Sequence, residues 1–173
     1  MRNLFKSILL ISFISISIQS FSQTDDLLTD LPKDTKDGYV KSEKKLINTV
    51  NWLETSPYDK DVDFRKKELL RMSAWLINTP TVDIVVDSKI VHFSKENSEL
   101  TLIFMGGWAK YSIENAYSKD LVKCNLAGLQ TIIRMYKKGN VASKKEEYLD
   151  QLVELDKNNE LEKWVTEQLN KKK

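Results

Sequence analysis

The sequence predicts an all-α protein with a single domain of six or seven helices at residues 39–170, arranged as a bundle or a short α-solenoid. Two observations carry this prediction. Apolar side chains recur at helical spacing through most of that range. Glycine and proline are scarce, with five and three residues in the whole chain, which favours long helices over a turn-rich β fold.

Residues 1–22 have the order of a secretory signal peptide. Positive charges at Arg2 and Lys6 precede an apolar run at residues 8–18, and small residues follow up to Ser22. The run is shorter than the roughly 20 residues that a membrane-spanning helix needs. We therefore expect cleavage before Gln23, without stable insertion in the membrane, and a mature protein that is periplasmic or secreted.

The charge and the cysteine content of the mature chain exclude some classes of function and of covalent structure. The full chain has 27 basic and 25 acidic residues, and two of the basic ones, Arg2 and Lys6, lie in the predicted signal. The mature chain therefore has no net charge and lacks the basic footprint of a nucleic-acid-binding protein. Cys124 is the single cysteine, so no internal disulfide can form, and its apolar neighbours favour a buried structural thiol.

The N-terminal half begins with a polar stretch and continues with two helices. Residues 23–38 carry five aspartates and predict a flexible N-terminal segment. A helix over residues 39–55 ends before Pro57, and a second helix runs from about Asp61 to the residues before Pro80. Both end in the pattern Trp-Leu-x-polar-Ser/Thr-Pro. We interpret this pattern as the same helix-terminating sequence occurring twice, and not as a structural repeat.

Residues 81–97 fit two secondary structures. The β-branched run at residues 81–86 could pair with residues 90–93 as a hairpin. The same residues also fit a helix that is broken near Asp87. Because an isolated two-stranded hairpin is only marginally stable in water, the helix is favoured.

The most apolar mature stretch, residues 100–117, predicts a central helix. Two adjacent glycines lie inside it, although each costs about 1 kcal/mol relative to alanine in a helix interior. We expect a second helix to cross closely there; the alternative is a kink or the approach of a ligand. Aromatic side chains near the glycines suggest a binding pocket. Its candidate residues are Gly106, Gly107, Trp108, Tyr111 and Tyr117.

Three helices follow toward the C-terminus. The first covers residues 119–138, with Gly139 placed to cap it and Ala127-Gly128 as a second point of close packing. The next is predicted to begin at Ser143, with Glu146 three residues later as a capping box. The last follows Asn158-Asn159 and ends in a lysine-rich tail.

Catalytic and metal-binding signatures are weak. His92 is the single histidine, which excludes histidine pairs, and its apolar neighbours favour a structural role. Asp59, Asp61 and Asp63 alternate as in a calcium loop, but the glycine and glutamate of that loop are missing. Their charges suit a helix N-terminus instead. We therefore expect no catalytic residue, no metal site and no cofactor.

Three short segments carry a resemblance. Residues 104–111 (FMGGWAKY), 125–129 (NLAGL) and 161–165 (LEKWV) resemble secreted helical proteins of the Bacteroidetes. The resemblance would cover most of residues 45–169 and implies a bacterial origin and a compartment outside the cytoplasm. Its motifs are packing motifs, so it carries over no catalytic residue.

The sequence as a whole favours an exported, non-enzymatic helical protein that binds a partner protein or a small apolar ligand. This expectation depends on the export signal, the helical periodicity and the scarcity of clustered titratable residues. The alternative is a small envelope hydrolase or transferase that uses carboxylates. Candidates for that chemistry are Glu68, Asp83 and Asp87, of which the last two are four residues apart.

Overall fold

The computed structural model describes residues 27–28, 35–143 and 145–171, and these residues form six helices and no strand. The helices are α1 (Lys36–Thr55), α2 (Val62–Asn78), α3 (Glu99–Glu114), α4 (Leu121–Lys137), α5 (Glu147–Lys157) and α6 (Leu161–Asn170). They form a single compact all-α domain, as the sequence predicts. The predicted signal peptide lies outside the described residues.

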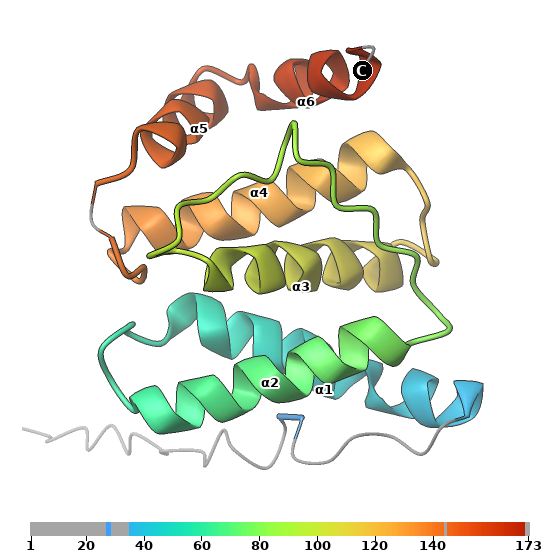
Figure 1. The fold of residues 1–173 in the computed structure, drawn as a ribbon. Helices are drawn as coiled ribbons and strands as arrows, with labels where there is room; N and C mark the ends of the chain where they lie inside the picture. The colour runs from blue at the N-terminus through green and yellow to red at the C-terminus, as the bar shows by residue number, and fades with distance from the viewer. Residues whose placement is uncertain (1–26, 29–34, 144, 172–173) are drawn as a thin grey trace, which may run out of the picture.

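The six helices stack as three pairs (Figure 1). Helices α3 and α4 form the middle pair and contact both the α1–α2 pair and the α5–α6 pair. Within the described residues, the two outer pairs do not contact each other. Contact between neighbouring pairs alone is the packing of a short solenoid. None of the described helices is long and apolar enough to cross a membrane.

Helix α3 is enclosed on both sides, which explains its apolar surface and its paired glycines. A Cβ atom at Gly106 would lie 2.9 Å from Val50 Cγ2 of α1 and 3.0 Å from Met72 Sδ of α2. A Cβ atom at Gly107 would lie 2.6 Å from Thr131 Oγ1 of α4. The predicted close crossing of helices is confirmed, and it occurs on two faces of α3 at once.

Gly128 of α4 faces the same crossing from the other side. A Cβ atom there would lie 2.6 Å from the Phe104 ring and 2.9 Å from the Phe104 carbonyl oxygen, which is backbone and cannot turn away. We expect Gly128→Ala to lower the free energy of unfolding by about 1–3 kcal/mol through overpacking. The intrinsic preference of alanine for helices, about 1 kcal/mol, opposes this loss. Urea denaturation measures the net change, and a higher midpoint would contradict the close approach.

Several helix ends follow the sequence signals. The backbone N–H groups of Ser56 and Thr79 donate to the carbonyls of Trp52 and Trp75, at 2.8 and 2.9 Å. The two Trp-Leu-x-polar-Ser/Thr-Pro segments therefore end α1 and α2 in the same way. Gly139 has a φ of 74° and ends α4, as predicted.

The predicted capping box at Ser143 does not form. Helix α5 begins at Glu147, and the Glu146 carboxylate accepts hydrogen bonds from the backbone N–H and hydroxyl of Ser94, both at 2.9 Å. The Ser143 hydroxyl donates to the Lys145 carbonyl. The Glu146 side chain therefore binds the segment that contains Ser94, which is distant in sequence, and does not cap the N-terminus of α5.

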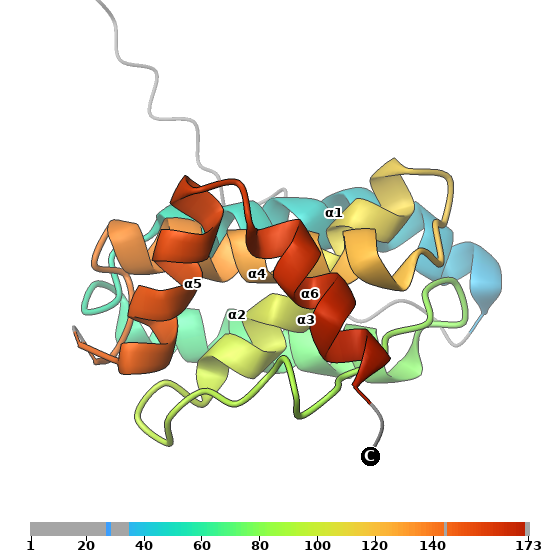
Figure 2. The ribbon, with the colours of Figure 1, turned by 90° about the horizontal axis from the view of Figure 1, so that it is seen from above.

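The connecting segment, residues 79–98, is neither helix nor strand, so the favoured helical interpretation of residues 81–97 is wrong. It rises from α2 across the middle pair and reaches α6 before it returns to α3 (Figure 1), and it runs along one side of the stack (Figure 2). Its apolar residues Val82, Ile90 and Val91 are buried. Side chains of other elements bind its backbone: Trp108 donates to the Asp83 carbonyl and Tyr148 to the Ile90 carbonyl.

Within the predicted flexible segment at residues 23–38, the structure describes residues 27–28 and 35–38. Leu27 and Leu28 are buried, and the Leu28 N–H donates to Thr49 Oγ1 at 3.0 Å. Helix α1 begins at Lys36, and the Thr35 hydroxyl caps it by accepting from Gly38 N. Leu28 belongs to the hydrophobic core, and burial of its apolar side chain stabilises its position against the helical domain.

Candidate functional site

The five sequence-predicted binding residues do not form one pocket. Gly106 and Gly107 lie at the helix crossing, and Trp108 is buried in the core, with its indole N–H 3.1 Å from the Asp83 carbonyl oxygen. Tyr117 is exposed, and its hydroxyl donates to Glu43 Oε2 at 3.0 Å. Gly107 and Tyr111 line the same cavity.

That cavity is a shallow polar pocket of about 210 Å³ between α3 and α4. Gly107 and Ala127 are small, so they leave room between the longer side chains around them. The remaining residues that line it are Lys110, Tyr111, Glu114, Gln130, Thr131 and Arg134. Its polar lining does not suit the apolar ligand that the sequence suggests.

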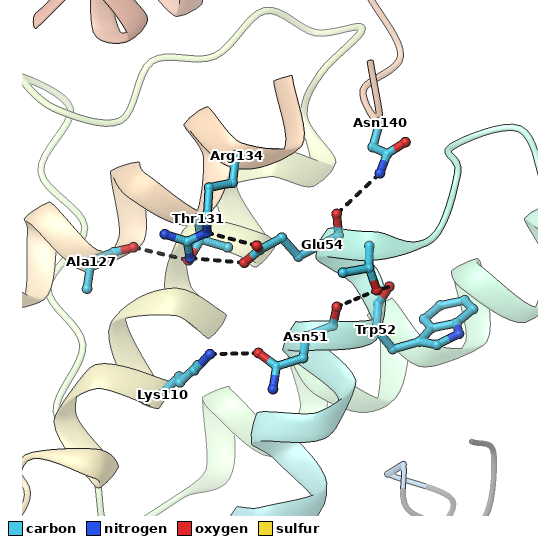
Figure 3. A network of polar contacts seen from close by, with 9 residues as sticks. Asn51, Trp52, Glu54, Lys110, Ala127, Thr131, Arg134 and Asn140 are labelled. Carbon is cyan, nitrogen blue, oxygen red and sulfur yellow. Dashed lines mark hydrogen bonds and ion pairs between the residues drawn. The ribbon is translucent and has the colours of Figure 1, made fainter. Parts of the chain in front are cut away.

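The cations beside this pocket stabilise the C-terminal end of α1 (Figure 3). The described helix α1 has no basic residue in its last turn, although that end carries partial negative charge. Arg134 of α4 binds the Glu54 carboxylate through Nε and Nη2, at 2.8 and 3.0 Å. Lys110 of α3 donates to Asn51 Oδ1 at 2.6 Å, and the Asn140 amide donates to the Glu54 carbonyl. These polar side chains therefore tie the last turn of α1 to α3, to α4 and to the residue Asn140.

A second pocket, which we call the α4–α6 pocket, lies between the connecting segment, α4 and α6. Its volume is about 420 Å³, within the range of small-molecule sites. Val85 and Leu121 line it and are 53% and 45% exposed, so they present apolar surface to a ligand. The full lining consists of Val85, Asp87, Leu121, Val122, Asn125, Thr166, Leu169 and Asn170.

Asn125 is the unusual member of this lining. The residue is 1% exposed, and its Nδ2 donates to the Leu121 carbonyl at 2.7 Å. Because a carbonyl only accepts, the amide nitrogen must face Leu121, and this fixes the opposite direction of Oδ1. Among the described residues Oδ1 has no hydrogen-bond partner. A buried acceptor without a partner costs about 1–3 kcal/mol.

Because comparison with known proteins finds no match, a function for this protein has to be argued from the geometry described above. No family model, curated protein or solved structure matches this chain. The resemblance of residues 104–111, 125–129 and 161–165 to secreted helical proteins of the Bacteroidetes therefore stays a proposal.

Sequence reasoning missed the α4–α6 pocket. Within the described lining, none of the sequence-predicted binding residues is present. Its walls come from three stretches that are far apart along the chain, residues 85–87, 121–125 and 166–170. Asn125 is an ordinary residue of an amphipathic helix by sequence, and the missing partner of Oδ1 is a property of the packed structure.

The three candidate carboxylates occupy different environments. Glu68 is completely buried and forms an ion pair with Arg71 of the same helix. Asp83 is exposed, with its carboxylate 2.7 Å from Lys119 Nζ. Asp87 closes a turn by accepting from Lys89 N at 2.9 Å. In the part of the chain that the structure describes, no group of three or more His, Cys, Asp or Glu side chains could hold a metal ion.

The cysteine and the histidine have structural surroundings. Cys124 is buried, as the sequence predicts, and its thiol donates to the Ser118 carbonyl. Burial, and to a smaller extent the charge of Asp120, raises the pKa of the Cys124 thiol to about 11. The thiol is therefore protonated at neutral pH and is a poor nucleophile. His92 is exposed and stacks on the Tyr148 ring, with 3.7 Å between the ring centroids.

Proposed function

We propose that this protein is exported and acts by binding a small apolar molecule in the α4–α6 pocket, without catalysis. The observation that carries the proposal is a pocket of about 420 Å³ whose wall includes the exposed apolar side chains of Val85 and Leu121. The order of charged, apolar and small residues in 1–22 supports the export step. The compartment is then the periplasm or the exterior of a bacterial cell.

A ligand in this pocket gains free energy by covering apolar surface. Each square ångström of apolar surface removed from water contributes about 25 cal/mol. Val85 comes from the connecting segment, Leu121 and Val122 from α4, and Leu169 from α6, so a bound molecule would contact all three elements. The polar pocket over Gly107 offers less apolar contact. The carboxylates of the enzymatic alternative do not converge on either pocket as a set.

A lysine at the mouth of the pocket tests this proposal. We expect Leu121→Lys to weaken binding of N-phenyl-1-naphthylamine at least tenfold, because the charged side chain replaces apolar contact surface. This apolar dye fluoresces more strongly in apolar surroundings, so a fluorescence titration measures its affinity.

Leu70→Lys is the matched control. Leu70 is 70% exposed on α2, in the opposite outer layer, and it does not line the pocket. We expect its dye affinity to equal that of the unmodified protein. Equal losses in both variants, or no dye binding by the unmodified protein, would contradict the proposed site.

A further inference from the structure

The polar atoms of the α4–α6 pocket indicate the chemistry of its ligand. We infer that the ligand is an amphiphile with an apolar body and a head group that donates hydrogen bonds and carries no acid. The inference rests on the proposed function and names the ligand class of the same pocket. Amines and alcohols share this head-group chemistry.

The first observation is the unsatisfied acceptor of Asn125. Its amide nitrogen is bound to the Leu121 carbonyl, so the hydrogen-bonding capacity that stays unused is that of Oδ1. An oxygen accepts and cannot donate, so only an N–H or O–H group satisfies it. Oδ1 is closed off from solvent in this structure, so the inference includes a small outward movement of the pocket wall that brings this oxygen into contact with the head group.

The second observation is that other polar groups in the lining also present acceptors. The Thr166 hydroxyl donates to the Glu162 carbonyl at 2.9 Å, so its oxygen retains the capacity to accept a hydrogen bond. Asp87 contributes a carboxylate. The Asn170 amide adds a further acceptor and a donor to the lining.

The charges around the pocket disfavour an acidic head group. Lys89, one of the cations near the pocket, lies 3.5 Å from Asp87 Oδ2 and donates to the Lys171 carbonyl at 2.9 Å. Its ammonium group therefore already faces two oxygens. A ligand carboxylate would meet Asp87 and the Asn125 oxygen, and both repel it. A donating head group meets complementary atoms at the same positions.

Three probes of equal chain length test the inference: octylamine, 1-octanol and octanoate. Calorimetric titration of the full mature protein measures each affinity. We expect octylamine and 1-octanol to bind at least tenfold more tightly than octanoate. Tighter binding of octylamine than of 1-octanol shows that the Asp87 charge contributes, and equal affinities show that the Asn125 acceptor is sufficient. Both results support a donating head group.

Two variants separate the roles of the polar groups. Asn125→Leu keeps a similar volume and removes the acceptor, so we expect 1-octanol to bind about tenfold more weakly while octanoate changes less than twofold. Asp87→Asn keeps the oxygen that accepts from Lys89 N and removes the charge. We expect it to weaken octylamine and to leave 1-octanol unchanged.

The failures of the two proposals are distinguishable. If octanoate binds as tightly as 1-octanol, while Leu121→Lys still abolishes dye binding, the pocket stands and the donor requirement is overturned. If Asn125→Leu leaves all three affinities unchanged, the role of Asn125 is overturned. If neither the dye nor any of the three probes binds, the proposed function itself fails.

Discussion

Replacing Trp108 with alanine is expected to lower the free energy of unfolding by about 3–5 kcal/mol. The residue is 1% exposed in the middle helix pair, and its ring packs 6.2 Å from the Phe104 ring, centroid to centroid. The substitution leaves a cavity between layers and also removes the indole N–H that holds the Asp83 carbonyl. Chemical denaturation followed by circular dichroism measures the loss.

Trp108→Phe separates packing from the hydrogen bond. Phenylalanine keeps most of the apolar contact and has no N–H group, so we expect a smaller loss of stability. Amide hydrogen exchange around Asp83 should nevertheless become faster, since the connecting segment loses a tie to α3. A loss below about 1 kcal/mol for Trp108→Ala would contradict the central packing of this residue. Equal losses for the two variants would contradict the ranking of packing above the hydrogen bond.

Replacing Arg71 with alanine is expected to destabilise the protein by about 3–5 kcal/mol, because a buried charge loses its partner. Glu68 is completely buried, and Arg71 binds one of its carboxylate oxygens. The other oxygen, Oε2, has no hydrogen-bond partner among the described residues. Urea denaturation of Arg71→Ala measures the penalty.

Glu68→Gln tests whether the charge causes the penalty. Glutamine removes the charge and keeps the shape, so the double variant Arg71→Ala, Glu68→Gln should recover most of the stability that Arg71→Ala loses. Lys41→Ala is a matched control, because Lys41 and Asp37 form an exposed ion pair on α1. We expect no measurable loss there. A double variant as unstable as Arg71→Ala would show that packing of Arg71, and not the charge of Glu68, dominates.

Local sequence signals predicted most of the helices. The residues before Pro57 and Pro80 end α1 and α2, and Gly139 ends α4 with a positive φ. These signals act within a few residues, so the helix ends can be predicted from a single sequence. The glycine pair of α3 predicted a close crossing because glycine in a helix interior is costly without compensation.

Local sequence signals do not predict the structure of the connecting segment. Residues 81–97 have the apolar content of a regular element, yet their backbone carbonyls accept from Trp108 and Tyr148, which lie far along the chain. Glu146 likewise binds Ser94 and Asn97 in place of a capping box. Side chains from other helices satisfied these polar groups, so neither a helix nor a hairpin was needed.

The sequence by itself determined the six helices, the C-terminal ends of α1, α2 and α4, and the central place of α3, since periodicity, proline and glycine act over one or two turns. Tertiary structure alone decided the α4–α6 pocket. Val85, Leu121 and Leu169 come together there only because three elements stack, and Asn125 Oδ1 lacks a partner only after they do. Burial of a polar atom is a property of the packed chain, so no local sequence pattern predicts it.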